Sequence, residues 1–124
     1  MPMRGIRGAT SVKEDLPSEI ISATKELLEA ILKENPSLDP VDIASCLFTA
    51  TPDLVSEYPA KAARELGWSE VPLMCAQEIP VPNGLERCVR VLIHWNTSVS
   101  QSEIQHVYLR KTKYLRPDIF AEQR

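Results

Sequence analysis

The chain has 124 residues, of which 44% are hydrophobic and 25% are charged, as in ordinary globular domains. Fourteen basic residues against seventeen acidic ones give a net charge of −3. This balance excludes an overall positive field that would attract nucleic acid or an anionic membrane. An anionic ligand would therefore have to be bound by a local cluster of arginines.

The cysteines and the N-terminal residues predict a cytoplasmic protein. The three cysteines are an odd number without C-x-x-C spacing, which argues against a disulfide framework and a zinc site. Residues 1–10 lack the apolar core of a signal peptide, and no run of about 18 apolar residues could span a membrane. His94 and His106 lack the spacing of a metal site, and nucleotide-binding motifs are absent, so no metal or cofactor is expected.

The first third of the chain predicts a strand followed by a long helix. Residues 3–10 have strand character, and Gly5 and Gly8 mark points where another segment can approach the backbone closely. From Ile20 to Leu32 apolar side chains recur at helical spacing, which predicts one amphipathic helix with Pro17 in its first turn and its end before Asn35-Pro36. Asp15 is placed to cap it.

The middle of the chain predicts a strand, a helix and a further strand. Residues 43–49 are a mostly apolar run of strand length, which suits a strand buried on both faces. Residues 59–66 are rich in helix formers, begin with proline and stop at Gly67, so a second, shorter helix is expected. Residues 71–76 have strand character again.

The last third begins with the strongest strand signal of the chain, residues 88–96 (CVRVLIHWN). Ser100 and Glu103 fit the capping box of a short helical segment, and residues 106–109 predict another strand. Residues 111–124 have no clear period and are expected to form a mobile tail.

This order of elements predicts one mixed α/β domain, an α+β mixed sheet spanning residues 1–124. The edges of so small a sheet need covering, and association often provides the cover. The residues alone therefore favour a homo-oligomer.

Arg90 is the first candidate for a functional residue. Side chains alternate along residues 88–96, so Arg90 shares a face with Leu92 and His94. A guanidinium in the middle of a strand needs an anionic partner, because an unpaired buried charge is costly. Two interpretations stay open: a structural ion pair between Arg90 and Glu78, or a site for an anionic ligand.

Other polar residues extend this candidate site. Arg7, in the first predicted strand, is expected to line an otherwise apolar site. Lys61 and Arg64 are three residues apart on one helix face near Tyr58, which is usually a solvated arrangement. Cys75 lacks an activating neighbour and is expected to be a packed residue. The set is rich in cations and has no convincing nucleophile, which favours an anionic ligand and non-covalent chemistry.

Seven short motifs run nearly from end to end of the chain. They are RGIRGAT (4–10), TATPDL (49–54), YPAKAAREL (58–66), CAQE (75–78), CVRV (88–91), HVYL (106–109) and LRPD (115–118). In this order and spacing they resemble the monofunctional, trimeric chorismate mutases. Each motif is weak alone, but the seven together are specific.

The resemblance implies a fold and a reaction. The fold is an α/β domain that assembles into a homotrimeric pseudo-barrel with its active sites between subunits. The reaction is the non-covalent, Claisen-type rearrangement of chorismate to prephenate by an isomerase that needs no cofactor. It belongs to the shikimate pathway and to aromatic amino acid biosynthesis.

The resemblance also implies roles for individual residues. Arg90 would hydrogen-bond the ether oxygen, where negative charge develops, and Arg7 would bind a carboxylate. Glu78 and the Cys75 region would contact the ring hydroxyl, and Tyr108 the enolpyruvyl end of the ligand. The residues expected around the entrance are Tyr58, Lys61, Arg64, Leu115 and Arg116.

The entrance departs from the family pattern. Residues 66–68 form a segment one residue shorter, and Tyr58 and Met74 stand where phenylalanine and threonine are more common. The main alternative function is a trimeric α/β protein that binds a small carboxylate metabolite without converting it. The combination of Arg90 and Glu78 favours the enzyme.

Overall fold

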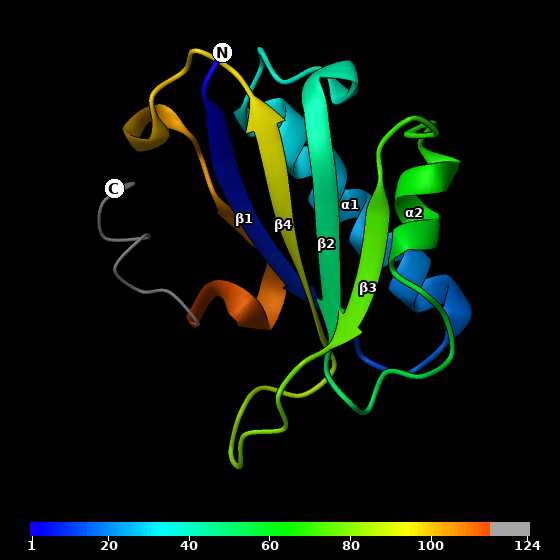
Figure 1. Cartoon of the computed structure of the whole chain (residues 1–124). Coiled ribbons are helices and arrows are strands. Elements are labelled where there is room, and N and C mark those ends of the chain that lie inside the picture. Colours follow the sequence, from blue (N-terminus) through cyan, green and yellow to red (C-terminus); the bar gives the residue numbers. More distant parts are fainter. Residues whose placement is uncertain (115–124) are drawn as a thin grey trace.

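A five-stranded sheet organises the chain in a computed structural model that describes residues 1–114 (Figure 1). The strands are β1 (Met3–Ser11), β2 (Ile43–Ala50), β3 (Leu73–Gln77), β4 (Cys88–Asn96) and β5 (Val107–Tyr108). Their order across the sheet is β3-β2-β4-β1-β5. Strand β4 lies antiparallel between β1 and β2, while β3 and β5 add in parallel at the two edges. The predicted mixed α/β class is confirmed.

Two α-helices cover one face of this sheet, α1 (Pro17–Glu34) and α2 (Ala60–Glu65). Helix α1 starts at a proline, whose fixed φ suits a first helical turn, and turns its apolar stripe toward the sheet. It crosses behind the strands in Figure 1, and α2 packs against α1 and β3. None of the helices in residues 1–114 is long and apolar enough to cross a lipid bilayer.

The hydrophobic core lies between α1 and the sheet. Phe48 and Trp95 are its largest fully buried side chains. Gly8 allows α1 to approach β1, because a Cβ built on it would lie 2.8 Å from Ile31 Cδ1 and 3.2 Å from Leu27 Cδ1. The expected close approach is therefore present at Gly8.

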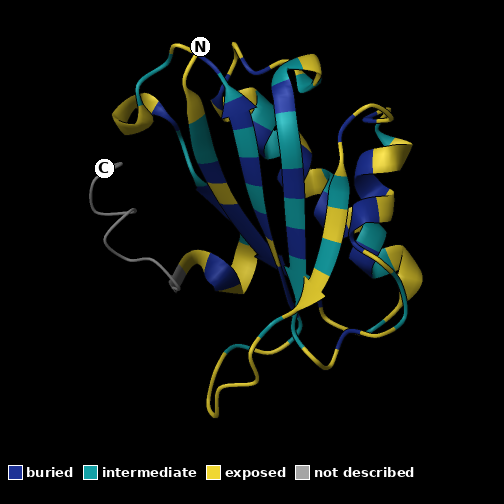
Figure 2. Cartoon of the chain, in the orientation of Figure 1, coloured by how far each residue is buried: buried dark blue, intermediate teal, exposed yellow. Residues whose placement is uncertain are grey.

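The described residues, 1–114, leave the opposite face of the sheet open. It is the front face in Figure 2, where buried segments alternate with half-buried and exposed ones along the strands. The prediction that residues 43–49 are buried on both faces is wrong for the single chain. Cys46 and Phe48 are buried under the helices, but Leu47 and Thr49 face the uncovered side and are only half-buried.

Asp15 does not cap α1, contrary to expectation. Leu16 occupies the N-cap and makes no capping hydrogen bond through its side chain. The Asp15 carboxylate instead accepts hydrogen bonds from the N–H groups of Val55 and Ser56 and from the Ser56 hydroxyl, at 2.8 to 3.2 Å. It thus connects the start of α1 to the loop between β2 and α2.

This contact predicts a pH dependence. The pKa of Asp15 is lowered, first by the Ser56 hydroxyl and also by the two N–H groups. The ionised carboxylate therefore stabilises the fold above about pH 4, its unfolded pKa, and this contribution disappears as the pH falls through the folded pKa. We expect Asp15→Asn to be less stable than the parent protein at pH 7, with the difference shrinking at acid pH. Thermal unfolding across a pH series would measure it; a difference that does not change with pH would contradict the assignment.

Residues 111–114 were expected to begin a mobile tail, but they belong to a 3-10 helix, Arg110–Tyr114. Thr112 is fully buried there, and its hydroxyl donates a 3.0 Å hydrogen bond to the carbonyl oxygen of Ala9. The two residues are 103 positions apart, so no local pattern could reveal the contact. The remainder of the predicted tail, residues 115–124, lies outside the described residues.

Candidate active site

A hollow of about 260 Å³ lies on the open face of the sheet, near the ends of β1 and β2. Pairing of the strands brings its residues together, because Arg90 in β4 is opposite Thr49 in β2 and Ala9 in β1. Four predicted site residues line this hollow, and we call them the first group. They are Arg7, Glu78, Arg90 and Tyr108. Leu47 and Leu92 add apolar wall.

Arg90 and Glu78 form an ion pair inside the hollow, with 3.2 Å between Arg90 Nε and Glu78 Oε1. The Arg90 side chain is 48% exposed and that of Glu78 is 23% exposed. Arg90 is less buried than its mid-strand position suggested, because no layer formed by residues 1–114 covers the open face. The approach to Glu78 is through Nε, whereas a guanidinium carries five N–H donors on three nitrogens. An ion pair with Glu78 and a ligand-binding role for Arg90 are thus compatible.

Arg7 extends from β1 into the same hollow. Its backbone N–H donates a 2.9 Å hydrogen bond to Nδ1 of His106, so this ring nitrogen acts as an acceptor. Tyr108, two residues further on, is buried in β5, which pairs with Gly8 and Ala9. The segment around β5 therefore covers the outer edge of β1 and fixes the backbone that carries Arg7.

The other predicted site residues form a second group, which lies elsewhere in the chain. Its members are Tyr58, Lys61, Arg64 and Cys75. Tyr58 and Cys75 line a separate hollow of about 430 Å³ between residues 50–59 and β3. Lys61 and Arg64 extend from α2 beside it and are both exposed. Leu115 and Arg116 lie outside the described residues.

Beside the second group, Glu57 holds the start of α2. Lys61 Nζ lies 3.4 Å from Glu57 Oε2, one helical turn away. The pKa of Glu57 is lowered, first because its carboxylate accepts the N–H of Tyr58 and then because of the Lys61 and Arg64 charges. These contacts keep Tyr58 and Lys61 at the same end of the helix.

The side chain of Cys75 faces away from the first group. Cys75 pairs with Phe48 across β2 and β3 and packs against the hydrophobic core, on the face opposite Arg90. This placement agrees with the expected packed residue. Cys46, a neighbour of Cys75, is buried. Burial raises the pKa of the Cys46 thiol to about 12, and the nearby Cys75 raises it as well. The neighbouring thiol Cys46 is therefore protonated at neutral pH.

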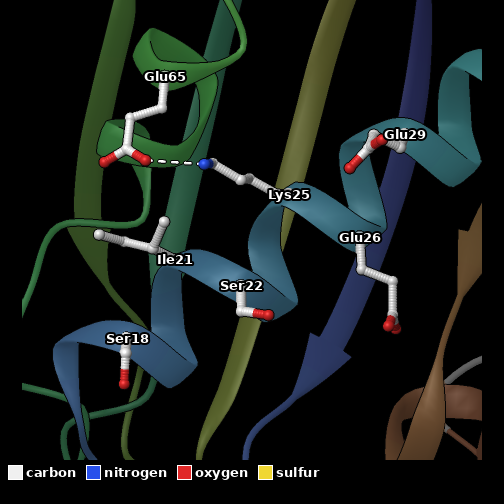
Figure 3. A pocket seen from close by; sticks show the side chains of 7 residues that line it. All are labelled: Ser18, Ile21, Ser22, Lys25, Glu26, Glu29 and Glu65. Carbon is white, nitrogen blue, oxygen red and sulfur yellow. Dashed lines mark ion pairs between the residues drawn. The ribbon is translucent and has the colours of Figure 1, made fainter.

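Another hollow lies on the helical side of the molecule, over α1 and α2 (Figure 3). It contains Glu26 and Glu29 of α1, and Lys25 there pairs with Glu65 of α2 at 2.7 Å. Glu65 already neutralises the charge of Lys25, and Glu26 and Glu29 add two further negative charges. This hollow therefore repels an anionic ligand. The cationic hollow around Arg90 is the better candidate.

Sequence reasoning did not identify Thr49 as a site residue. Its hydroxyl donates a 2.6 Å hydrogen bond to Glu78 Oε1, and it lines the hollow beside Arg90. Thr49 is part of the TATPDL motif, but only the register of β2 against β4 places it next to Arg90. A threonine in an apolar run is otherwise an ordinary strand residue.

Comparison with known proteins adds to this geometry. Residues 3–119 match the family model "Chorismate mutase type I". The chain is 51% identical over 120 residues to "Chorismate mutase AroH" of Bacillus subtilis (strain 168), covering 96% of this chain and 94% of that protein. It is 48% identical over 121 residues to "Chorismate mutase AroH" of Thermus thermophilus, covering 98% and 99%.

The chain belongs to the type I chorismate mutase family. A solved structure agrees with this, the "Chorismate mutase from Clostridium thermocellum Cth-682". It superposes with a TM-score of 0.85 at 45% identity and covers 88% of this chain and 96% of that one. The isomerase class and the chorismate mutase function predicted from the seven motifs are confirmed by this membership.

Proposed function

We propose that the first group binds chorismate and promotes its rearrangement to prephenate in aromatic amino acid biosynthesis. The observation that carries this proposal is the placement of Arg90, Arg7 and Glu78 in one hollow, whose other lining residues are apolar except for Thr49 and Tyr108. Two guanidinium groups suit a dianionic substrate, and one carboxylate suits a hydroxyl group of that substrate. Among residues 1–114, those that line the hollow include no activated nucleophile, and a unimolecular rearrangement does not need one.

Arg90 would donate to the ether oxygen, where negative charge develops as the C–O bond breaks. A fixed donor directed at developing charge lowers the barrier because it binds the transition state more tightly than the ground state. One such donor contributes about 3 to 4 kcal/mol, while even modest enzymatic acceleration requires about 8 kcal/mol. Arg7, Glu78 and Tyr108 would supply the remainder by holding the flexible substrate in its compact reactive conformation.

We further propose that the complete site forms between two subunits of a homotrimer. The first hollow is about 260 Å³ and leaves the Arg90 side chain 48% exposed, so residues 1–114 of one chain do not enclose a ligand there. Tyr58, Lys61 and Arg64 of the second group lie at a different hollow and would complete the site when contributed by the neighbouring subunit. Large apolar side chains are exposed on the loop before α2, on β3 and on the loop after β3, and they fit burial in such an interface. They are Val55, Tyr58, Met74, Ile79 and Val81.

The arrangement can be tested by mixing two inactive proteins. One carries Arg90→Ala in the first group, and the other carries Lys61→Ala and Arg64→Ala in the second group. After the mixture is unfolded and reassembled at equal amounts, roughly a quarter of the sites would join two intact halves. We expect the mixture to regain chorismate turnover at roughly a quarter of the parent level. Turnover is measured as the loss of the ultraviolet absorbance of chorismate.

The matched control combines two variants of the same group, Arg90→Ala and Arg7→Ala. Every site then retains one damaged half, so no activity should return. If mixed trimers form and neither mixture gains activity, the site lies within one chain. If the parent protein itself turns over no chorismate above buffer, the enzymatic proposal fails and binding of a small carboxylate without conversion becomes the better account.

A cytoplasmic location is part of the same proposal. Cys46, Cys75 and Cys88 are all free thiols, as expected in a reducing compartment. The predicted absence of a metal or cofactor is likewise a proposal, which activity of the protein after extensive chelation would test.

A further inference from the structure

The carboxylate of Glu78 is held from the neighbouring strand by a threonine. Thr49 Oγ1 donates a 2.6 Å hydrogen bond to Glu78 Oε1. Arg90 Nε lies 3.2 Å from this same oxygen. Oε1 therefore accepts the hydrogen bond of Thr49 and is also the oxygen that forms the ion pair with Arg90.

Thr49 is well suited to hold a side chain in place. It lies in β2, which is paired on both sides by β3 and β4, and its β-branched side chain has little rotational freedom. Glu78 is less constrained, because it directly follows β3 and its side chain has several rotatable bonds. Its backbone N–H also donates to the carbonyl oxygen of Ala50, next to Thr49. Both anchors of Glu78 therefore come from the end of β2.

Without the threonine hydroxyl, a different pairing becomes favourable. A carboxylate and a guanidinium readily form a two-pronged contact, with both oxygens on two N–H groups. Such a contact would occupy Glu78 Oε2 and further donors of Arg90. The hydrogen bond from Thr49 opposes it, because it keeps Oε1 turned toward β2.

We propose that Thr49 is a positioning residue for the reaction. Thr49 holds Glu78 by Oε1, so Glu78 Oε2 remains available to a hydroxyl group of the substrate. The outer N–H groups of Arg90 then remain available to the ether oxygen and to a carboxylate of the substrate. The inference rests on the proposed function of this hollow and adds to it a residue that acts through Glu78.

The test compares two variants of Thr49. Thr49→Val keeps the shape and removes the donor, and it is expected to lower kcat/KM for chorismate roughly 10-fold, the effect of one hydrogen bond to a charged group. Thr49→Ser keeps the donor and should stay within roughly threefold of the parent protein. Equal losses in both variants would mean that packing matters and the hydroxyl does not, and the inference would be wrong.

A double-mutant cycle separates positioning from a merely structural effect. In a Glu78→Ala background, Thr49→Val has no carboxylate to release, so it should change kcat/KM less than about twofold. An unchanged 10-fold loss in that background would contradict the inference. If Thr49→Val does not fold, Thr49→Ala provides the same cycle without the donor.

Ser45→Ala is the matched control. Ser45 lies on the same strand and face, but its hydroxyl contacts His94 Nδ1 at 2.9 Å, away from Glu78. Near-parental kinetics are expected for it. Normal chorismate turnover by Thr49→Val would overturn the role of Thr49 alone, whereas absence of turnover by the parent protein would overturn the proposed function.

Discussion

Replacement of Arg90 by lysine is expected to lower kcat for chorismate by roughly 10²- to 10³-fold, the usual loss of one donor to a developing oxyanion. Lysine keeps the positive charge and can still approach Glu78. It provides a compact point charge in place of a planar fork, so it cannot address the ether oxygen and a carboxylate together. Steady-state kinetics, with circular dichroism and sizing of the assembly, would measure the loss in a folded protein.

Arg4→Lys is the control for this substitution. Arg4 also lies in the sheet, in β1 opposite Trp95 of β4, but its Nε donates to the carbonyl oxygen of Val99 at 3.2 Å, outside the hollow. Its kinetics should stay close to those of the parent protein. A near-normal kcat for Arg90→Lys would show that charge alone suffices and would remove the reason for an arginine at this position.

Gly8→Val is expected to reduce the free energy of unfolding by about 2 to 3 kcal/mol, as for other overpacked cores. A Cβ at this position would lie 2.8 Å from Ile31 Cδ1, 3.1 Å from Val91 Cγ1 and 3.2 Å from Leu27 Cδ1. These side chains are buried and tightly packed, so α1 would have to move away from β1. Urea unfolding at a fixed protein concentration would measure the loss.

Gly5→Ala provides the comparison on the same strand. The nearest heavy atom to a Cβ on Gly5 is Leu92 Cδ1 at 3.7 Å, an ordinary van der Waals distance. Its effect on unfolding should lie within about 0.5 kcal/mol. Similar stabilities of Gly8→Val and Gly5→Ala would contradict the close packing of α1 on β1. Gly5 and Gly8 lie in the same predicted strand, and the sequence does not distinguish their surroundings. They differ because a Cβ on Gly8 would point toward α1, whereas a Cβ on Gly5 would point to the other face of the sheet.

Elements with a strong local period were predicted well. The long helix, the strand of residues 88–96 and the short helix that stops at Gly67 lie within a few residues of their expected positions. Each is specified by its own residues, through apolar spacing, a proline near the start or a glycine at the end. The role of Asp15 was missed because its partners, Val55 and Ser56, are about 40 positions away.

The sequence by itself determined the family, the order of the elements and the candidate residues Arg7, Glu78 and Arg90. Motif identity and local periodicity are properties of the chain, and they do not depend on its long-range contacts. Tertiary structure alone decided which candidates meet. The register of β4 against β2 places Thr49 opposite Arg90, and Thr49 also reaches Glu78. The register of β3 against β2 places Cys75 opposite Phe48, on the other face of the sheet. Because a one-residue change of register would reverse both outcomes, no local pattern could have fixed them.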